Sequence, residues 1–136
     1  MDYVIRVYAD PSEIPSTEWD SLLARQEAPT PFMQHAYLAA LHASGSATIE
    51  TGWDTQFVTL WQAEKMVAAA TLYIKAHSYG EYVFDWAWAN AYAQHRLPYY
   101  PKGLVAVPFT PVPGSRLLAD SDEHRDMLLQ ALIAIL

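Results

Sequence analysis

The segment from Lys75 to Glu81 concentrates side chains that can bind or move a proton. Its sequence, KAHSYGE, places an imidazole at His77 and a carboxylate at Glu81, with Gly80 allowing a tight turn between them. A second carboxylate, Asp85, follows four residues later, about one helical turn away. Histidine titrates near neutral pH, and two neighbouring carboxylates raise the pKa of one of them. We therefore take Glu81, Asp85 and His77 as candidate catalytic residues for removing a proton from an amine.

Each of these residues also has an ordinary structural interpretation. His77 would be a histidine at the end of a strand, Glu81 a solvated surface charge, and Asp85 the cap of the following helix. His77 and Ser78 do not form a nucleophile and base pair, because adjacent strand residues point to opposite faces. His35 and His42 share a helix face but lack a third ligand, so no metal site is expected.

Aromatic rings and prolines are unusually dense after the first catalytic candidates. Ten aromatic residues lie between Tyr73 and Phe109, and five of the nine prolines lie between Pro98 and Pro113. Core packing explains most such rings, and the cations among them can simply balance nearby acids. The mixture also fits a rigid groove on which Tyr79, Glu81, Asp85, Lys102 and Arg116 converge. The candidate substrate-binding residues are Tyr79, Tyr82, Trp86, Tyr100, Lys102 and Arg116.

The composition excludes several classes of function. The net charge of −7, with eight scattered basic residues among 136, argues against a DNA-binding protein. The absence of cysteine rules out disulfides and thiolate chemistry. The longest nearly apolar run, residues 66–74, is too short to span a membrane, and the first residues do not read as a signal peptide. We expect a soluble, cytoplasmic protein.

Hydrophobic periodicity predicts an alternation of helices and strands. Two β-rich runs flank the polar turn 63–65, which indicates an antiparallel hairpin. Thr30 with Pro31, and Asp120 with Glu123, are helix-start signals. Strands are expected at 3–9, 56–62, 66–77 and 102–110, and helices at 16–26, 30–45, 84–96 and 120–136. This order indicates an α+β fold with an α/β-type mixed sheet flanked by helices.

The last predicted helix carries an apolar face to the final residue, Leu136. It can pack inward and stop, or it can need a further partner. We favour the second interpretation, in which residues 1–136 are a partial domain at the front of a longer protein with two halves. Self-association through this helix is also expected.

Three long strings resemble one family. They are PFMQHAYLAALHASGSATIETGW, YIKAHSYGEYVFDWAWANAY and YYPKGLVAVPFTPVPGSRLL, at residues 31–53, 73–92 and 99–118, and the resemblance extends over nearly the whole chain. They resemble the bacterial FemAB-like predicted N-acyltransferases, within the wider Gcn5-related N-acetyltransferase (GNAT) superfamily. The resemblance implies the N-terminal half of a GNAT-like acyl-CoA N-acyltransferase fold. It also implies transfer of an acyl or aminoacyl group to a small-molecule or peptide amine, such as that of a peptidoglycan precursor.

The chain departs from the acetyltransferase pattern where a pyrophosphate loop should precede a helix. Residues 110–124 read TPVPGSRLLADSDEH, in which prolines remove amide donors and acids crowd the helix start. We therefore assign no cofactor to this segment, although the resemblance implies an acyl-CoA or aminoacyl-tRNA donor in the full-length protein. The alternative function is a non-catalytic acceptor-binding module of a two-half protein, and a third is an α+β interaction protein. As a fragment alone, the segment is expected to be inactive.

Overall fold

The main sheet of the protein has four antiparallel strands in the order β1-β3-β4-β7. The computed structural model describes residues 2–81 and 85–136. β1 (Tyr3–Tyr8), β3 (Phe57–Gln62) and β4 (Lys65–Ala70) appear where the sequence predicts strands, and β7 (Leu117–Ala119) is an addition. The pairing of β3 with β4 is antiparallel, as the hairpin signal predicted.

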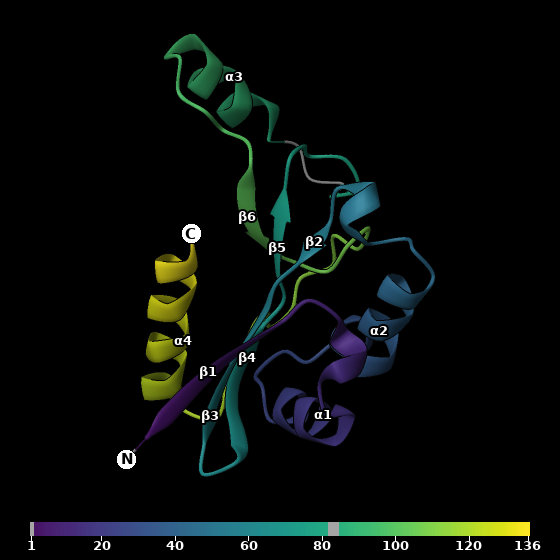
Figure 1. Ribbon diagram of the computed structural model, residues 1–136, viewed down its shortest axis with the longest axis vertical. Coiled ribbons are helices and arrows are strands. Elements are labelled where there is room, and N and C mark those ends of the chain that lie inside the picture. The colour runs from purple at the N-terminus through teal and green to yellow at the C-terminus, as the bar shows by residue number, and fades with distance from the viewer. Residues whose placement is uncertain (1, 82–84) are drawn as a thin grey trace.

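Helices cover both faces of this sheet, as Figure 1 shows. α1 (Ser16–Ala24) and α2 (His35–Ala43) lie on one side, and α4 (Asp122–Ile135) lies on the other. The side chains of β3 contribute to both layers, because successive residues of a strand face opposite sides of the sheet. Phe57 and Trp61 belong to the apolar cluster with α1 and α2, whereas Val58 and Leu60 pack with α4.

The strand predicted over residues 66–77 is divided at Thr71. β4 ends at Ala70 in the main sheet, and β5 (Leu72–Lys75) belongs to a second sheet in the order β2-β5-β6. Buried Thr71 is held by residue 106, because its hydroxyl donates to the Ala106 carbonyl at 2.8 Å. The chain therefore passes from one sheet to the next without a loop. β2 (Asp54–Thr55) and β6 (Lys102–Val105) complete this smaller sheet.

α3 (Trp86–Gln94) stands at the far end of the smaller sheet, away from the main body (Figure 1). Two of its aromatic side chains, Trp88 and Tyr92, are exposed. The ring-rich segment of the sequence is therefore distributed over different environments. Tyr73 is buried in the core, whereas Tyr79 and Trp88 are 80% and 67% exposed.

Two predicted helix starts need correction. Thr30 and Pro31 begin a short 3-10 turn over Pro31–Met33, and α2 begins only at His35 because Gln34 is extended. The cap of α4 is Ser121 rather than Asp120, since the Ser121 hydroxyl accepts from the His124 backbone N–H. The carboxylate of Asp120 instead contacts the ring of His124.

α4 divides its apolar residues between two environments. Leu128 and Leu132 are buried against the sheet, while Leu129, Ile133 and Leu136 are exposed. The helix thus packs inward along one stripe and leaves a second apolar stripe on the surface. The expected partner for that second stripe stays a prediction.

The fold is α+β, which confirms the class predicted from sequence. Its sheet is not the expected mixed one, because all strand pairings among residues 2–81 and 85–136 are antiparallel. The difference arises after Val105, where the predicted strand 102–110 ends early. The chain then adds β7 antiparallel to β4.

Candidate functional site

Two lysines face each other across the smaller sheet. Lys75 of β5 is the register partner of Lys102 of β6, so both side chains leave the same face of the sheet. Like charges directly opposite each other are destabilising in a strand pair. Lys75 is fully buried, and the side chain of Lys102 is only 12% exposed. This pair therefore requires negative charge beside it.

Glu81 supplies that charge between the two lysines. Its carboxylate has one oxygen, Oε1, 2.8 Å from Lys102 Nζ and the other, Oε2, 3.3 Å from Lys75 Nζ. Glu81 Oε2 accepts no hydrogen bond of good geometry from the described residues, so the contact with Lys75 is electrostatic. The Glu81 side chain is 3% exposed, which makes it a buried bridge rather than a solvated surface acid.

Asp85 is the second acid of the cluster. It occupies the N-cap position of α3, yet its side chain makes no capping hydrogen bond. Its Oδ2 instead accepts from Lys102 Nζ at 2.7 Å, from Ser78 Oγ at 2.8 Å and from the Tyr99 hydroxyl at 2.6 Å. The carboxylate of Asp85 is thus turned toward the lysines rather than used as a helix cap.

The two lysines have their pKa values moved in opposite directions. Burial lowers the pKa of Lys75, and the neighbouring Glu81 opposes this only in part. Burial acts in the same direction on Lys102, but its hydrogen bonds to Asp85 and Glu81 outweigh it and raise the pKa of Lys102. Lys75 is therefore the lysine of this pair that gives up its proton more readily.

The expectation that one of the two carboxylates would have a raised pKa does not hold for Asp85. Burial alone would raise the pKa of Asp85, but hydrogen bonds from Lys102, Tyr99 and Ser78 lower it to about 2. Lys102 lies between the two acids, because its Nζ is 2.8 Å from Glu81 Oε1 and 2.7 Å from Asp85 Oδ2. Asp85 therefore stays ionised at neutral pH and is a poor base.

His77 and the ring of Tyr79 lie outside the ion cluster. The Nδ1 atom of His77 accepts from the Tyr79 backbone N–H at 3.1 Å, and the two rings are 5.0 Å apart between centroids. The His77 ring packs against Gly52, where an added Cβ would lie 2.1 Å from Nε2. Tyr79 contributes its backbone carbonyl, which accepts from Lys75 Nζ, while its ring points to solvent.

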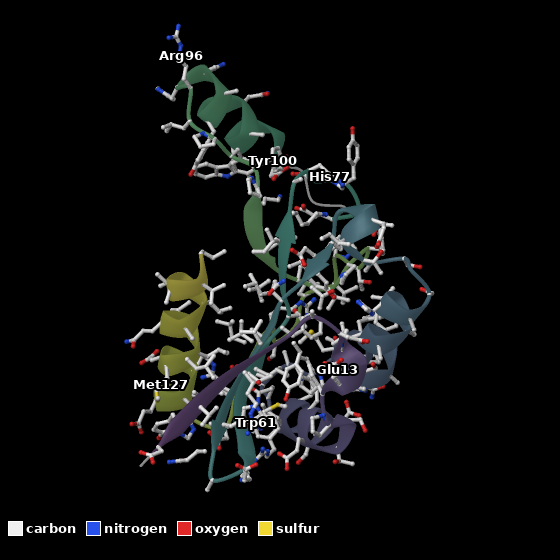
Figure 2. All side chains as sticks on the ribbon, viewed as in Figure 1. Glu13, Trp61, His77, Arg96, Tyr100 and Met127 are labelled. Atoms are coloured by element: carbon white, nitrogen blue, oxygen red, sulfur yellow. The ribbon has the colours of Figure 1, made fainter. Side chains whose placement is uncertain are left out.

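Tyr100 joins the cluster through Ser78, because their hydroxyl groups hydrogen-bond. Figure 2 shows Tyr100 beside the outer end of β5 and β6, where α3 begins. The neighbouring Tyr99 packs edge-on against it, with 4.9 Å between ring centroids. Tyr82 lies outside the described residues, as does the side chain of Trp86, so their predicted roles stay predictions.

Arg116 lies apart from the lysines but shares a pocket with Glu81. The pocket has a volume of about 280 Å³ and is formed mainly by β6 and the proline-rich chain after it. Its walls are mostly aliphatic. The lining residues are Glu81, Leu104, Val105, Ala106, Val107, Thr110, Pro111, Val112, Pro113 and Arg116. Of the five residues expected to converge, Glu81, Asp85 and Lys102 are in contact, Arg116 reaches only the pocket, and the Tyr79 ring points away.

Lys75 and Ser78 lie in the stretch that the sequence analysis considered, but the candidate site residues chosen from it did not include them, nor Tyr99 or Trp53. Lys75 Nζ lies 3.6 Å from the ring centroid of Trp53, a cation–π contact inside the core. A signal for Lys75 was present, because it ends an otherwise apolar strand run. A lysine in such a run is rarely fully buried without a partner.

Neither a metal site nor a membrane helix is found in the part of the chain that the structure describes. Residues 2–81 and 85–136 contain no group of three histidine, aspartate or glutamate side chains arranged to hold a metal ion. Among the same residues, no helix has the length and apolar character needed to cross a bilayer.

Comparison with known proteins gives one match. A search of curated proteins and a search of solved structures each return nothing similar. A family model named FemAB-like, described as peptidoglycan biosynthesis/recognition, matches residues 10–136. That range includes all four residues of the ion cluster, Arg116 and nearly every element of the fold. The chain therefore belongs to the FemAB-like family.

Proposed function

We propose that this domain belongs to an N-acyltransferase that transfers an acyl or aminoacyl group to an amine of a peptidoglycan precursor. The observation that carries the proposal is Glu81, a buried carboxylate that joins the cluster of Lys75, Lys102 and Asp85 to the aliphatic pocket. Glu81 thus ties the cavity to a buried ionic cluster in which Lys75 and Asp85 have shifted pKa values, and such a cluster beside a cavity is a common signature of a functional site.

The chemistry needs a neutral amine and a path for its proton. The amine nitrogen bonds to the carbonyl carbon of the donor, and the bond from that carbon to the donor's leaving group breaks. The amine proton passes to the cluster and from there to the leaving group. In this scheme Glu81, which lines the pocket, orients the amine, receives its proton and passes that proton to the leaving group, while Lys75 holds the Glu81 carboxylate in place.

The element order supports the GNAT-like part of the proposal. From the N-terminus it runs through a strand, two helices, a hairpin, α3, further strands and α4. The GNAT fold implied by the resemblance has a strand, two helices, two strands, a helix, a strand and a helix in its N-terminal half, and the structure follows this order with β2, β5 and β7 as additional strands. The donor would be acyl-CoA or aminoacyl-tRNA, the two that the resemblance implies for the full-length protein.

A second candidate function is a non-catalytic module that binds the amine acceptor while another part of the protein carries the chemistry. The start of α4 favours it. Ser121 caps this helix, and Asp122 and Glu123 fill its first turn, so a pyrophosphate placed there would meet negative charge. In this case the aliphatic pocket would hold the acceptor, and the ion cluster would serve only to shape it.

Turnover of variants of the full-length protein distinguishes the two functions. Amide formation would be followed by mass spectrometry with acyl-CoA or aminoacyl-tRNA as donor and a peptidoglycan precursor as acceptor. Glu81→Gln should lower turnover per folded molecule about a hundredfold or more, as for loss of a positioned base. Glu64→Gln is the matched control, because the Glu64 side chain is 88% exposed. Unchanged turnover for Glu81→Gln would leave only the binding module.

A further inference from the structure

The aliphatic pocket contains one cation whose charge is not balanced. The four cluster residues, two lysines and two carboxylates, balance one another through the ion pairs of Glu81 and Asp85. Arg116, on the chain leading to β7, forms no ion pair with any of the described residues. Its Nη2 donates to the Val112 carbonyl, and its Nη1 donates weakly to the Ser115 carbonyl at 3.5 Å.

The guanidinium of Arg116 therefore has both spare charge and spare donors. An arginine has five N–H groups, and only two of those on Arg116 meet acceptors among the described residues. Burial lowers the pKa of Arg116, which shows that the guanidinium has lost part of its hydration. An anion in the pocket would accept hydrogen bonds from the guanidinium and so replace the water that burial removes from it.

The shape of the chain keeps this cation close to the pocket wall. A Cβ atom on Gly114 would lie 3.1 Å from Nη1 of Arg116 and 2.5 Å from Cγ2 of Thr30. Only glycine allows the backbone to approach both groups so closely. The close approach of the backbone at Gly114 therefore places it beside the guanidinium at the pocket wall.

We infer that the pocket binds the carboxylate of a small aliphatic group, with the Arg116 guanidinium as its partner. A carboxylate matches the planar fork of one guanidinium, whereas a phosphate usually draws on several donors. The walls of Leu104, Val107 and Val112 suit a branched aliphatic body. Glu81 on the same pocket would repel a doubly charged anion more strongly than a single carboxylate.

This inference rests on the proposed function and deepens it, because it assigns a carboxylate to the amine acceptor. The acceptor class would be an amino acid or peptide whose free carboxylate lies beside an aliphatic side chain. The carboxylate would occupy the Arg116 side of the pocket, while the amine would reach the Glu81 side. The ligand's carboxylate would then meet the unbalanced charge of Arg116, and its amine would lie beside the carboxylate of Glu81 that orients it in the proposed function.

Calorimetry with two small probes tests this assignment. N-acetylvaline carries the carboxylate and the aliphatic body, and N-acetylvalinamide is its neutral counterpart. The wild-type protein should bind the acid at least about tenfold more tightly than the amide, the factor expected for one charge-assisted pair. Arg116→Gln should abolish that preference, and Arg116→Lys, which keeps the charge but loses the fork, should retain part of it.

Arg96→Gln is the matched control, because Arg96 is exposed just after the end of α3, at the far end of the molecule from the main sheet (Figure 2). This variant should keep the full preference for the acid. Equal binding of acid and amide, no saturable binding of the acid, or the same preference in Arg116→Gln would each overturn the inference. So would competition by inorganic phosphate as strong as that by N-acetylvaline, which would indicate a general anion site.

A measurement on the wild-type protein guards against variants that fail to fold. N-acetylvaline should shift the NMR signals of backbone amides in residues 104–107 and 112–116, together with the Arg116 side chain, and shifts confined to other regions would contradict the assignment. Because no turnover is involved, the result is separable from the proposed function. If N-acetylvaline binds but Glu81→Gln leaves turnover unchanged, only the transferase proposal is contradicted. If Glu81→Gln lowers turnover but N-acetylvaline does not bind, only the carboxylate site is contradicted.

Discussion

At the scale of single residues, the ion cluster is built from charges that are stable only together. Lys75 and Lys102 are cross-strand partners, and Glu81 lies between their ammonium groups. Desolvating each charge is costly, and the attraction between them offsets that cost only while every partner remains. Removing one member should therefore affect both folding and function.

Glu81→Gln should lower the free energy of unfolding by about 3 kcal/mol. The substitution leaves Lys75 with no carboxylate in contact and Lys102 with Asp85 alone, and breaking a buried pair has costs of this size. Urea unfolding of both proteins measures the difference. The exposed Glu64→Gln control should change stability by much less than 1 kcal/mol. Equal stability of Glu81→Gln and wild type would show that the cluster is hydrated and loosely held.

The lowered pKa of Asp85 predicts a dependence of stability on acid pH. In the folded protein this pKa is about 2, below the ordinary value of 3.8, so ionised Asp85 stabilises the fold above about pH 4. That contribution is lost as the pH falls through about 2. The midpoint temperature of thermal unfolding, measured between pH 5 and pH 2, should therefore fall less steeply for Asp85→Asn than for the wild type. A matched change at exposed Asp126 (Asp126→Asn) should leave the slope as it is in the wild type.

At the scale of elements, the division of the predicted strand 66–77 at Thr71 creates the site. β4 belongs to the main sheet, and β5 carries Lys75 into the smaller sheet beside β6. The hydrogen bond from Thr71 to the Ala106 carbonyl and the backbone bond from Ala106 N–H to the Thr71 carbonyl hold this junction. The same β6 strand then forms part of the pocket wall.

The turn of the β3–β4 hairpin offers a separate test of local backbone strain. Ala63 and Glu64 have φ values of 52° and 63°, in the left-handed region that asparagine and glycine adopt more easily. The double substitution Ala63→Asn with Glu64→Gly should raise the free energy of unfolding by about 1 kcal/mol. Glu64→Ala keeps a Cβ in the same conformation and should give no such gain. Chemical denaturation of the three proteins compares them directly, and a loss of stability in the double variant would contradict the turn geometry.

At the scale of the whole molecule, apolar surface remains uncovered along α4 and the edge strand β1. Leu129, Ile133 and Leu136 are exposed on the helix, and Val4 and Ile5 are exposed on the strand. Exposed apolar patches of several hundred Å² commonly mark interfaces. Self-association through α4 and a continuation into a second half both stay predictions, and the reading frame after Leu136 tests the latter.

Sedimentation of two α4 variants tests self-association. Ile133 is 66% exposed, so Ile133→Lys should leave stability nearly unchanged but shift any dimer toward monomer. Leu132→Ala instead removes a buried side chain and should cost about 3 kcal/mol of stability. A wild-type protein that sediments as a monomer at all concentrations would refute self-association through this helix.

The sequence by itself determined the parts of the protein that depend on local periodicity. Runs rich in β-branched and aromatic residues predicted β1 and β3, and the polar turn predicted the hairpin. Helical spacing of apolar residues predicted α1 and α4, and alanine spacers predicted α3. These features arise because each residue's preference is set by neighbours within a few positions. The resemblance to the FemAB-like family was also found from the sequence alone, and the family match over residues 10–136 confirms it.

Only the tertiary structure decided which side chains share a site. Lys75 and Lys102 are distant in the sequence, and their contact follows from the register of β5 with β6. The same register places Lys102 between Glu81 and Asp85, and its hydrogen bond helps to lower the pKa of Asp85. Arg116 meets the pocket through the path of the chain after β6, and the Tyr79 ring turns outward. Burial and electrostatic surroundings depend on such long-range contacts, which no local sequence pattern encodes.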